Sequence, residues 1–165
     1  MQTKLIVVRV GVWVAVSLAC IAGFSSAVAQ SHSVSVVVND KNPVTNVTTA
    51  ELRKIFAGQI HFWRGGSGVL AVVLFVRAPG ANERVVLLKL LDMSESEYKK
   101  YWTAQVFRGE VLAEPVALFS NGMQKEALAA FPGAVALVNS EDVKPGMKVV
   151  KVDGHLPGEP AYPFN

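Results

Sequence analysis

Cysteine is nearly absent from this chain of 165 residues, in which Cys20 is the only one. A single thiol can form no disulfide within the chain, and a cysteine metal site needs several thiolates. Histidine is also scarce, since His32, His61 and His155 are scattered and show no ligand spacing of the HExxH kind. No serine lies in the context of a nucleophile elbow. These absences predict a protein that is not an enzyme and that holds no metal or other cofactor.

The N-terminal segment has the pattern of a secretory signal. An apolar stretch, VGVWVAVSLACIAGF at 10–24, is followed by the small residues AVA at 27–29. This pattern predicts a signal peptide at 1–29 that is cleaved before Gln30, and therefore an exported, periplasmic protein without a membrane span. Two alternatives are a single membrane anchor, for which the apolar stretch is short, and lipoprotein anchoring through Cys20.

The charge of the chain is close to balanced. It contains 16 Lys and Arg against 13 Asp and Glu, a formal net charge of +3. Lys4 and Arg9 leave with the signal, so the mature chain carries 14 minus 13, or +1. A balance this near zero gives no reason to expect a nucleic-acid partner, whose phosphates attract a clearly basic surface. Cleavage leaves 165 minus 29, or 136 residues, which is enough for one hydrophobic core.

Strand-like and helix-like segments alternate along the mature chain, which is typical of an α/β domain. We expect this domain to span 30–153 and an irregular tail, containing three prolines, to follow at 154–165. The run VLAVVLFV at 69–76 has no polar alternation and predicts a central strand covered on both faces. The segment at 148–152 has the pattern of an edge strand. The other expected strands are at 34–38, 116–119 and 134–138.

Two helix starts are unusually complete. Thr48 is followed three residues later by Glu51, and Ser94 by Glu97, so that each pair can form a capping box. Gly58 is expected to end the first of these helices, because glycine readily adopts the left-handed conformation found after a helix. Further helices are expected at 82–91 and after Ser120 or Asn121.

The segment between the strand at 69–76 and the helix at 82–91 has the outline of an anion-binding turn. The strand leads into Arg77, and Pro79 and Gly80 turn the chain into the helix. This order points backbone N–H groups and the positive end of a helix at one place, which favours an anion there. The turn contains no serine or threonine, and Glu83 adds a carboxylate near its mouth.

Four segments, taken in order, resemble the phosphate-binding proteins of ABC transporters. They are IFAGQIHFWRGG at 55–66, the Arg77 turn, YWTAQVFRGE at 101–110 and ALAAFPGAVALV at 127–138, and the resemblance covers 36–152. It implies one lobe of a type 2 periplasmic-binding-protein fold, with a mixed sheet and helices on both faces. It also implies a non-enzymatic protein that binds phosphate or another small oxyanion and works with a transporter. The implied ligand-binding residues are Arg77, Gly80, Ala81 and Asn82, to which Ser120 and Asn121 could add donors from another helix start.

The turn departs from the family pattern Arg-x-x-Gly-Ser-Gly-Thr. Arg77 and Gly80 match this pattern. The positions of its serine, second glycine and threonine are occupied by Ala81, Asn82 and Glu83. Two hydroxyl donors are therefore missing, each worth about 1 kcal/mol.

Two charged residues and a missing second lobe leave the function open. Glu83 is expected to repel an anion, and the neighbouring Arg84 to offset this repulsion in part. The chain holds one lobe, whereas members of the family normally close two lobes over the ligand. One function is weak binding of phosphate or another oxyanion, with a partner protein supplying the second wall. The alternative is a protein-interaction module that kept the fold and lost the ligand.

Overall fold

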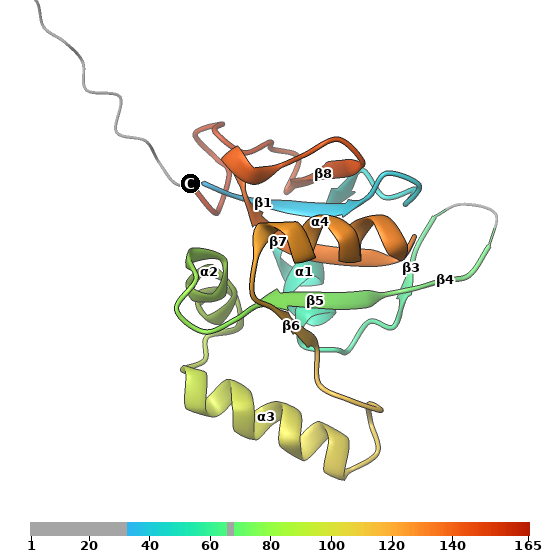
Figure 1. Cartoon of the computed structure of the whole chain (residues 1–165), viewed down its shortest axis with the longest axis vertical. Helices are drawn as coiled ribbons and strands as arrows, with labels where there is room; N and C mark the ends of the chain where they lie inside the picture. Colours follow the sequence, from blue (N-terminus) through green and yellow to red (C-terminus); the bar gives the residue numbers. More distant parts are fainter. Residues whose placement is uncertain (1–32, 66–67) are drawn as a thin grey trace, which may run out of the picture.

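A computed structural model describes residues 33–65 and 68–165 (Figure 1). The predicted signal peptide, its cleavage site before Gln30 and Cys20 lie outside these residues. In the described part, six strands form one sheet in the order β2-β8-β1-β7-β5-β6, and β3 and β4 pair separately. The strands are β1 (Val34–Asn39), β2 (Asn46–Val47), β3 (Phe62–Trp63), β4 (Leu70–Ala71), β5 (Val73–Arg77), β6 (Val116–Leu118), β7 (Ala134–Asn139) and β8 (Met147–Val152). The helices are α1 (Thr49–Phe56), α2 (Asn82–Leu91), α3 (Glu95–Phe107), α4 (Asn121–Ala130) and the short 3-10 helix η1 (Ser140–Asp142).

The main sheet is mixed. β7 runs parallel to β5, β5 to β6, and β8 to β2, whereas β1 is antiparallel to both β7 and β8. Among the described strands of this sheet, β1 therefore opposes all the others. The carboxyl ends of the others lie along one edge of the sheet, which we call the carboxyl edge. Helices α1, α2 and α4 begin shortly after β2, β5 and β6, so their N-termini lie at this edge.

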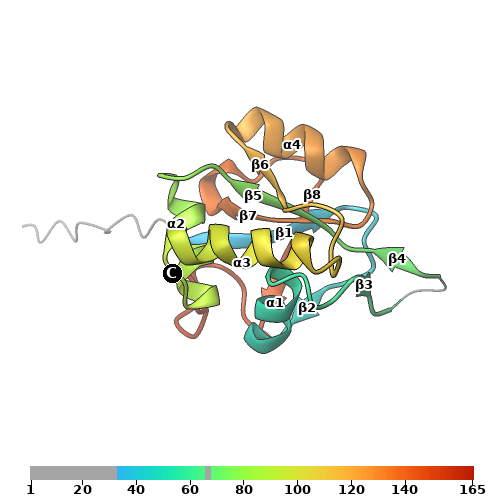
Figure 2. The ribbon, with the colours of Figure 1, turned by 90° about the horizontal axis from the view of Figure 1, so that it is seen from below.

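Helices cover both faces of the sheet, as the resemblance implies (Figures 1 and 2). Because side chains alternate along β1, Val36 belongs to the core on one face and Val37 to the core on the other. α4 lies over the second of these faces, where its Leu128 is fully buried. α1 and α2 pack on the first face, and Figure 2 shows α1 and α4 on opposite sides of the strands.

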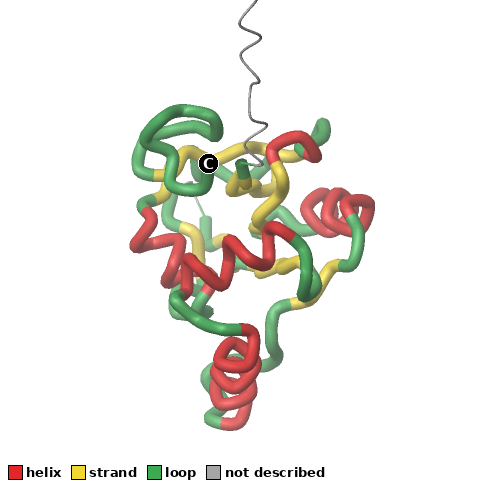
Figure 3. Tube along the Cα trace, turned by 90° about the vertical axis from the view of Figure 1, so that its left-hand side faces the viewer, coloured by secondary structure: helices red, strands yellow, loops and turns green. Residues whose placement is uncertain are grey.

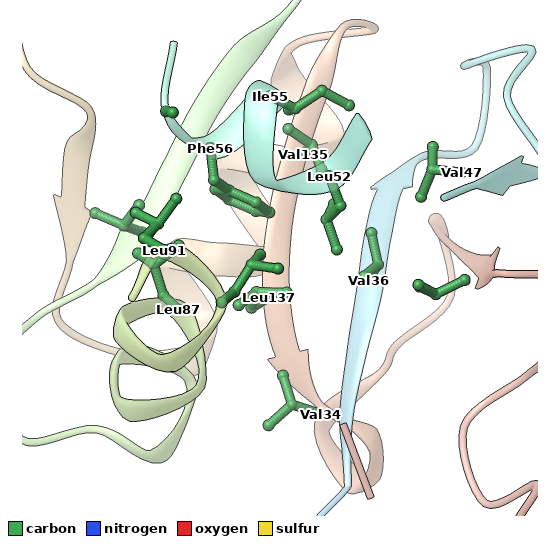
Figure 4. Close-up of a cluster of buried hydrophobic side chains, with 14 of the residues drawn as sticks. Val34, Val36, Val47, Leu52, Ile55, Phe56, Leu87, Leu91, Val135 and Leu137 are labelled. Atoms are coloured by element: carbon green, nitrogen blue, oxygen red, sulfur yellow. The ribbon is translucent and has the colours of Figure 1, made fainter. Parts of the chain in front are cut away.

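The larger core forms beneath α1 (Figure 4). The spacing of apolar residues on this helix puts Leu52, Ile55 and Phe56 on one side, and all three are at most 3% exposed. They share the core with Leu137 of β7 and Leu87 of α2. Burial of each such side chain stabilises the fold by about 1.5–3 kcal/mol, so this core fixes α1 and α2 against the same face.

The apolar run at 69–76 is not a single strand, which corrects the prediction. It divides at Val72 into β4, which pairs with β3, and β5, which joins the main sheet between β7 and β6. At the division, Val72 N donates to His61 O at 2.8 Å, whereas Val73 N donates to Gly133 O at 3.0 Å. The remaining strand, β5, has the interior position in the sheet that the apolar run predicts.

The prediction of an edge strand at 148–152 is also wrong. β8 pairs with β1 on one side, and the two-residue strand β2 adds a parallel partner on the other. The pairing joins Val47 to Val152, which lie far apart in the sequence. The outermost strand on this side of the sheet is therefore β2. No local sequence pattern around β8 could indicate this.

Both predicted capping boxes are confirmed. Thr48 Oγ1 accepts from Glu51 N at 3.1 Å, and Glu51 Oε2 accepts from Thr48 N at 2.9 Å. Ser94 and Glu97 make the same reciprocal pair at the start of α3. Gly58, with a φ of +69°, follows the end of α1 as predicted.

The C-terminal segment 154–165, all of it described, contains no helix or extended strand but packs on the sheet (Figure 3). Tyr162 is 4% exposed, and its hydroxyl donates to Val34 O at 2.9 Å. Val34 N in turn donates to Phe164 O at 2.9 Å. Burial raises the pKa of Tyr162 to about 12, so this hydroxyl keeps the proton that it donates to Val34 O at alkaline pH, where an ordinary tyrosine would ionise. The segment is thus irregular in its backbone and yet part of the folded core.

Candidate functional site

The predicted site residues meet at the carboxyl edge, at the ends of β5 and β6. The two strands are parallel and in register, so that Arg77 lies opposite Leu118. Ala78 N donates to Leu118 O at 3.0 Å and fixes the start of the turn against β6. α2 begins after Ala81 and α4 after Ser120, so both helices present their N-termini beside these strand ends.

The two helix starts differ in how they are capped. Ser120 Oγ accepts from Met123 N at 3.2 Å, so this hydroxyl already serves α4, whose first residue, Asn121, is exposed. Ala81 makes no side-chain hydrogen bond to cap α2. Gly80, with a φ of +92°, adopts the left-handed conformation that glycine tolerates best. A helix start without a capping side chain has N–H groups that another acceptor can satisfy, which is what an anion-binding turn requires.

Arg77 is paired with Glu83 inside the turn. Arg77 Nε lies 3.5 Å from Glu83 Oε1, and the two side chains are 14% and 2% exposed. Arg77 Nη1 also donates to Leu118 O at 3.5 Å. Neither Nε nor Oε1 has a hydrogen-bond partner within the described chain, so the ion pair is what compensates both groups. Glu83 is therefore buried against the arginine rather than placed at the mouth of the turn.

Arg84 does not offset Glu83, which corrects a second expectation. Its guanidinium donates to Glu95 through Nη2 at 2.6 Å and through Nε at 3.0 Å. It also lies over the ring of Tyr98, 3.8 Å from the ring centre. The hydrogen bond from Arg84 lowers the pKa of Glu95, as expected for a charge-assisted pair. Arg77 and Arg84 are thus both neutralised by carboxylates of the chain itself.

The carboxyl edge contains further polar groups that were not predicted from the sequence. Asn82 Nδ2 donates to Asn139 Oδ1 at 3.0 Å, which ties the start of α2 to the end of β7. The hydroxyls of Ser33 and Ser35 each lie 2.8 Å from that of Ser140, which directly follows β7. The local signal for these groups is a polar pair immediately after an apolar strand, at 139–140. They extend the hydrogen-bonding surface of the edge from β5 toward β1.

The tryptophan and glycine residues of the other motifs hold the fold together. Trp63 Nε1 donates to Gly133 O at 2.9 Å, which links the first motif to the last. A Cβ at Gly133 would lie 1.7 Å from Ala71 O, so glycine alone fits there. A Cβ at Gly58 would lie 2.6 Å from the ring of Trp102, which packs on this residue. These motif residues therefore stabilise the lobe, and they leave the chemistry of the site to the Arg77 turn.

The described residues offer neither a metal-binding group nor a membrane-spanning helix. No three or more His, Cys, Asp or Glu side chains in this part of the chain are arranged to hold a metal ion. No helix among the same residues combines the length and the apolarity that crossing a bilayer requires.

Solved structures of phosphate-transport proteins share this fold, although no family model matches the sequence. An ABC-type phosphate transport receptor from Vibrio cholerae matches with a TM-score of 0.60 at 23% sequence identity, over 76% of this chain and 48% of that chain. A Clostridium perfringens protein, named as a phosphate ABC transporter substrate-binding protein with bound phosphate, gives 0.59 at 19% identity over 74% and 45%. PstS from Borrelia burgdorferi gives 0.56 at 17% identity over 76% and 49%.

These likenesses confirm the fold that the four motifs predict. The chain has the fold of one lobe of a type 2 periplasmic binding protein. It spans less than half the length of the solved structures that it matches. At 17–23% identity the likeness concerns the fold, and the matched proteins are named as receptors and binding proteins rather than as enzymes.

Proposed function

We propose that this lobe is an exported solute-binding domain related to phosphate ABC transporter substrate-binding proteins, and that it binds phosphate or another small oxyanion weakly at the Arg77 turn. The observation that carries the proposal is the meeting of Arg77 with the N-termini of α2 and α4 at the carboxyl edge. Helix N-termini and a guanidinium are groups that bind oxyanions in proteins. The likeness in fold to proteins named for phosphate supports the choice of ligand.

Glu83 sets the expected strength of binding. Because its carboxylate lies 3.5 Å from Arg77 Nε, an incoming oxyanion must displace it or accept its repulsion. The turn also lacks the two hydroxyls of the family pattern, each worth about 1 kcal/mol. The expected dissociation constant is on the order of millimolar, which corresponds to about −4 kcal/mol.

The proposal includes an exported location and a partner. Residues 1–29 would direct secretion, and cleavage before Gln30 would release the lobe into the periplasm. The chain spans less than half of the matched proteins, and in this proposal a partner protein or a transporter supplies a second wall over the ligand. A wall that excludes water would strengthen the electrostatic contacts at the turn.

The buried ion pair also favours a second function. A buried arginine that already faces a buried carboxylate needs no external anion, so the charge of Arg77 is compensated without phosphate. On this alternative the domain kept the fold, lost the ligand and serves as a protein-interaction module. Glu83 is the residue on which the choice between the two functions depends.

Calorimetric titration with phosphate at low salt separates the two functions. Weak binding that disappears in Arg77→Gln supports the oxyanion-binding domain, because this substitution removes the charged arm of the site. Arg108→Gln is the matched control, since Arg108 is an exposed arginine paired with Glu110, and it should leave the titration unchanged. If wild-type protein binds neither phosphate nor sulfate at about 50 mM, well above the expected millimolar constant, the interaction module remains as the function.

A further inference from the structure

A groove runs along the seam between α1 and α2, outside the core of the first face. It consists of two cavities of about 630 and 380 Å³, and Thr49 and Arg53 of α1 line both of them. The larger cavity is also lined by the end of α2 and by Tyr101 of α3, and the smaller by the outer side of α2 and the last residues of the chain. We call the two cavities together the α1–α2 groove. Ala57, Gln59 and Tyr101 of its lining belong to the first and third motifs, although neither motif indicates a groove.

Apolar side chains form much of the wall of the α1–α2 groove. At its far end, Tyr101 Oη donates to Ala57 O at 2.7 Å and joins α3 to α1. An apolar chain laid in the groove would remove this wall from water, which is favourable in proportion to the area covered. The apolar lining residues are Leu91, Met93 and Tyr101 in the larger cavity and Val86, Leu90, Pro163 and Phe164 in the smaller.

The charged side chains that line the groove are all basic. Arg53 lines both cavities, Lys54 the larger and Lys89 the smaller, and none of the described lining residues is Asp or Glu. Arg53 and Lys89 are exposed and form no ion pair with any residue that the structure describes. The neighbouring carboxylate of Asp153 is held by Thr49, whose Oγ1 donates to Asp153 Oδ2 at 2.5 Å. The groove therefore combines an apolar wall with positive charge that no side-chain carboxylate of its lining neutralises.

We propose that the α1–α2 groove binds an anionic amphiphile, a molecule with one carboxylate or phosphate-monoester head and one apolar chain. The head lies in the smaller cavity between Arg53 and Lys89, and the chain runs past Arg53 into the larger cavity toward Tyr101. A bare anion would leave the apolar wall in water, and a neutral chain would leave the two cations unused. The volumes of 630 and 380 Å³ fall within the range of small-molecule sites, roughly 300–1,000 Å³.

This site goes beyond the oxyanion site proposed at Arg77. The two share Asn82, which begins α2 and lines the smaller cavity. Their charged groups are different, because Arg77 faces Glu83 in the turn whereas Arg53 and Lys89 line the groove. Loss of either site should therefore leave the other in place.

The first test is a calorimetric titration of the mature protein with laurate below its micellar concentration. We expect saturable binding of laurate. Dodecyltrimethylammonium has the same chain with the opposite charge, and acetate has the same head without the chain, so both should bind at least about tenfold more weakly. Absence of saturable laurate binding overturns the proposal. Equal binding of the cationic probe, or of acetate, overturns it as well, because the cations or the apolar wall would then play no part.

Paired variants locate the site. Arg53→Gln with Lys89→Gln changes two exposed positions and should weaken laurate binding at least about tenfold. Lys99→Gln with Lys100→Gln removes the same charge from exposed positions on α3 that line neither cavity, and should leave binding unchanged. Unchanged binding in the first variant, or equal loss in both, contradicts the proposal. Arg77→Gln should keep laurate binding while losing phosphate, which distinguishes failure of one site from failure of the other.

Discussion

The Arg77 turn and the α1–α2 groove lie on the same lobe but differ in whether their positive side chains are paired with carboxylates. At the turn, which the sequence indicates as an anion site, Arg77 is paired with Glu83 inside the protein. In the groove, which no motif indicates, Arg53 and Lys89 form no ion pair with any described residue. An arginine in a binding motif therefore does not by itself establish an anion site. Whether the arginine is available to an external anion depends on whether the chain places a carboxylate of its own beside it.

The location of Glu83 explains why its charge can be buried. It lies in the first turn of α2, where the positive end of the helix dipole favours a carboxylate. Arg77 compensates the charge from the end of β5, and a buried carboxylate without such a partner would be strongly destabilising. The same features that favour an external anion therefore stabilise an internal one.

Breaking the buried pair should have the largest effect. Arg77→Ala leaves the Glu83 carboxylate at 2% exposure without its partner, which should lower the free energy of unfolding by about 3 kcal/mol. Glu110→Ala is the control, because both side chains of its pair with Arg108 are 53% exposed, and such pairs contribute at most about 1 kcal/mol. Urea unfolding measures both variants. Equal losses of stability would show that burial does not make the Arg77–Glu83 pair more important than an exposed pair.

Restoring the family pattern at the turn should have the next largest effect. Glu83→Thr with Ala81→Ser removes the internal carboxylate and adds two hydroxyls near the start of α2. Phosphate affinity should then rise at least about tenfold, or about 1.4 kcal/mol, in calorimetric titrations at low salt. A double variant that binds phosphate no better than wild type would mean that the residues at positions 81 and 83 do not limit binding.

A smaller effect is expected at the start of α1, beside the groove. Thr48→Ala removes the cap of this helix and should lower the free energy of unfolding by about 1 kcal/mol. Hydrogen bonds from Thr48 lower the pKa of Glu51 below its ordinary value of 4.5. Their contribution is thus present above pH 4.5 and is lost as the pH falls through the folded pKa.

Thr48→Ala keeps the backbone hydrogen bond to Glu51 and loses the one from the hydroxyl. The difference between wild type and Thr48→Ala should therefore shrink in acid by the contribution of the hydroxyl alone. Urea midpoints at neutral pH and near the acid limit of folding measure this change. Thr45→Ala, in the preceding loop, is the matched control and should shift the midpoint little at either pH. A difference that stays constant with pH would show that the Thr48 hydroxyl does not lower the pKa of Glu51.

The parts of the fold that could be predicted from the sequence depend on neighbouring residues. The capping boxes at Thr48 and Ser94 join residues three positions apart, so the sequence displays both members of each pair. The helix expected at 82–91 is α2 with the same bounds. Gly58 ends α1 because its own backbone conformation is left-handed. In each case the determining interaction lies within one helical turn.

The features that the sequence did not reveal depend on contacts between distant segments. β8 is an interior strand because β2 pairs with it, and the run at 69–76 divides where Val73 turns toward Gly133. The inward direction of Glu83 depends on how α2 packs against the sheet, which no pattern in the turn records. The α1–α2 groove likewise exists because two helices pack side by side. The motif therefore marks the turn between β5 and α2 but could not show that Glu83 points inward to Arg77.

In the proposed function, Glu83 takes the place in which an oxyanion would meet Arg77. Glu83→Gln tests it most directly, because glutamine keeps the shape of the side chain and removes its charge. Glu110→Gln is the control, since it removes a charge at an exposed position. In calorimetric titrations at low salt, where screening is least, phosphate should bind Glu83→Gln at least about tenfold more tightly than wild type, and Glu110→Gln should match wild type. Equal phosphate affinities of wild type and Glu83→Gln would contradict the account.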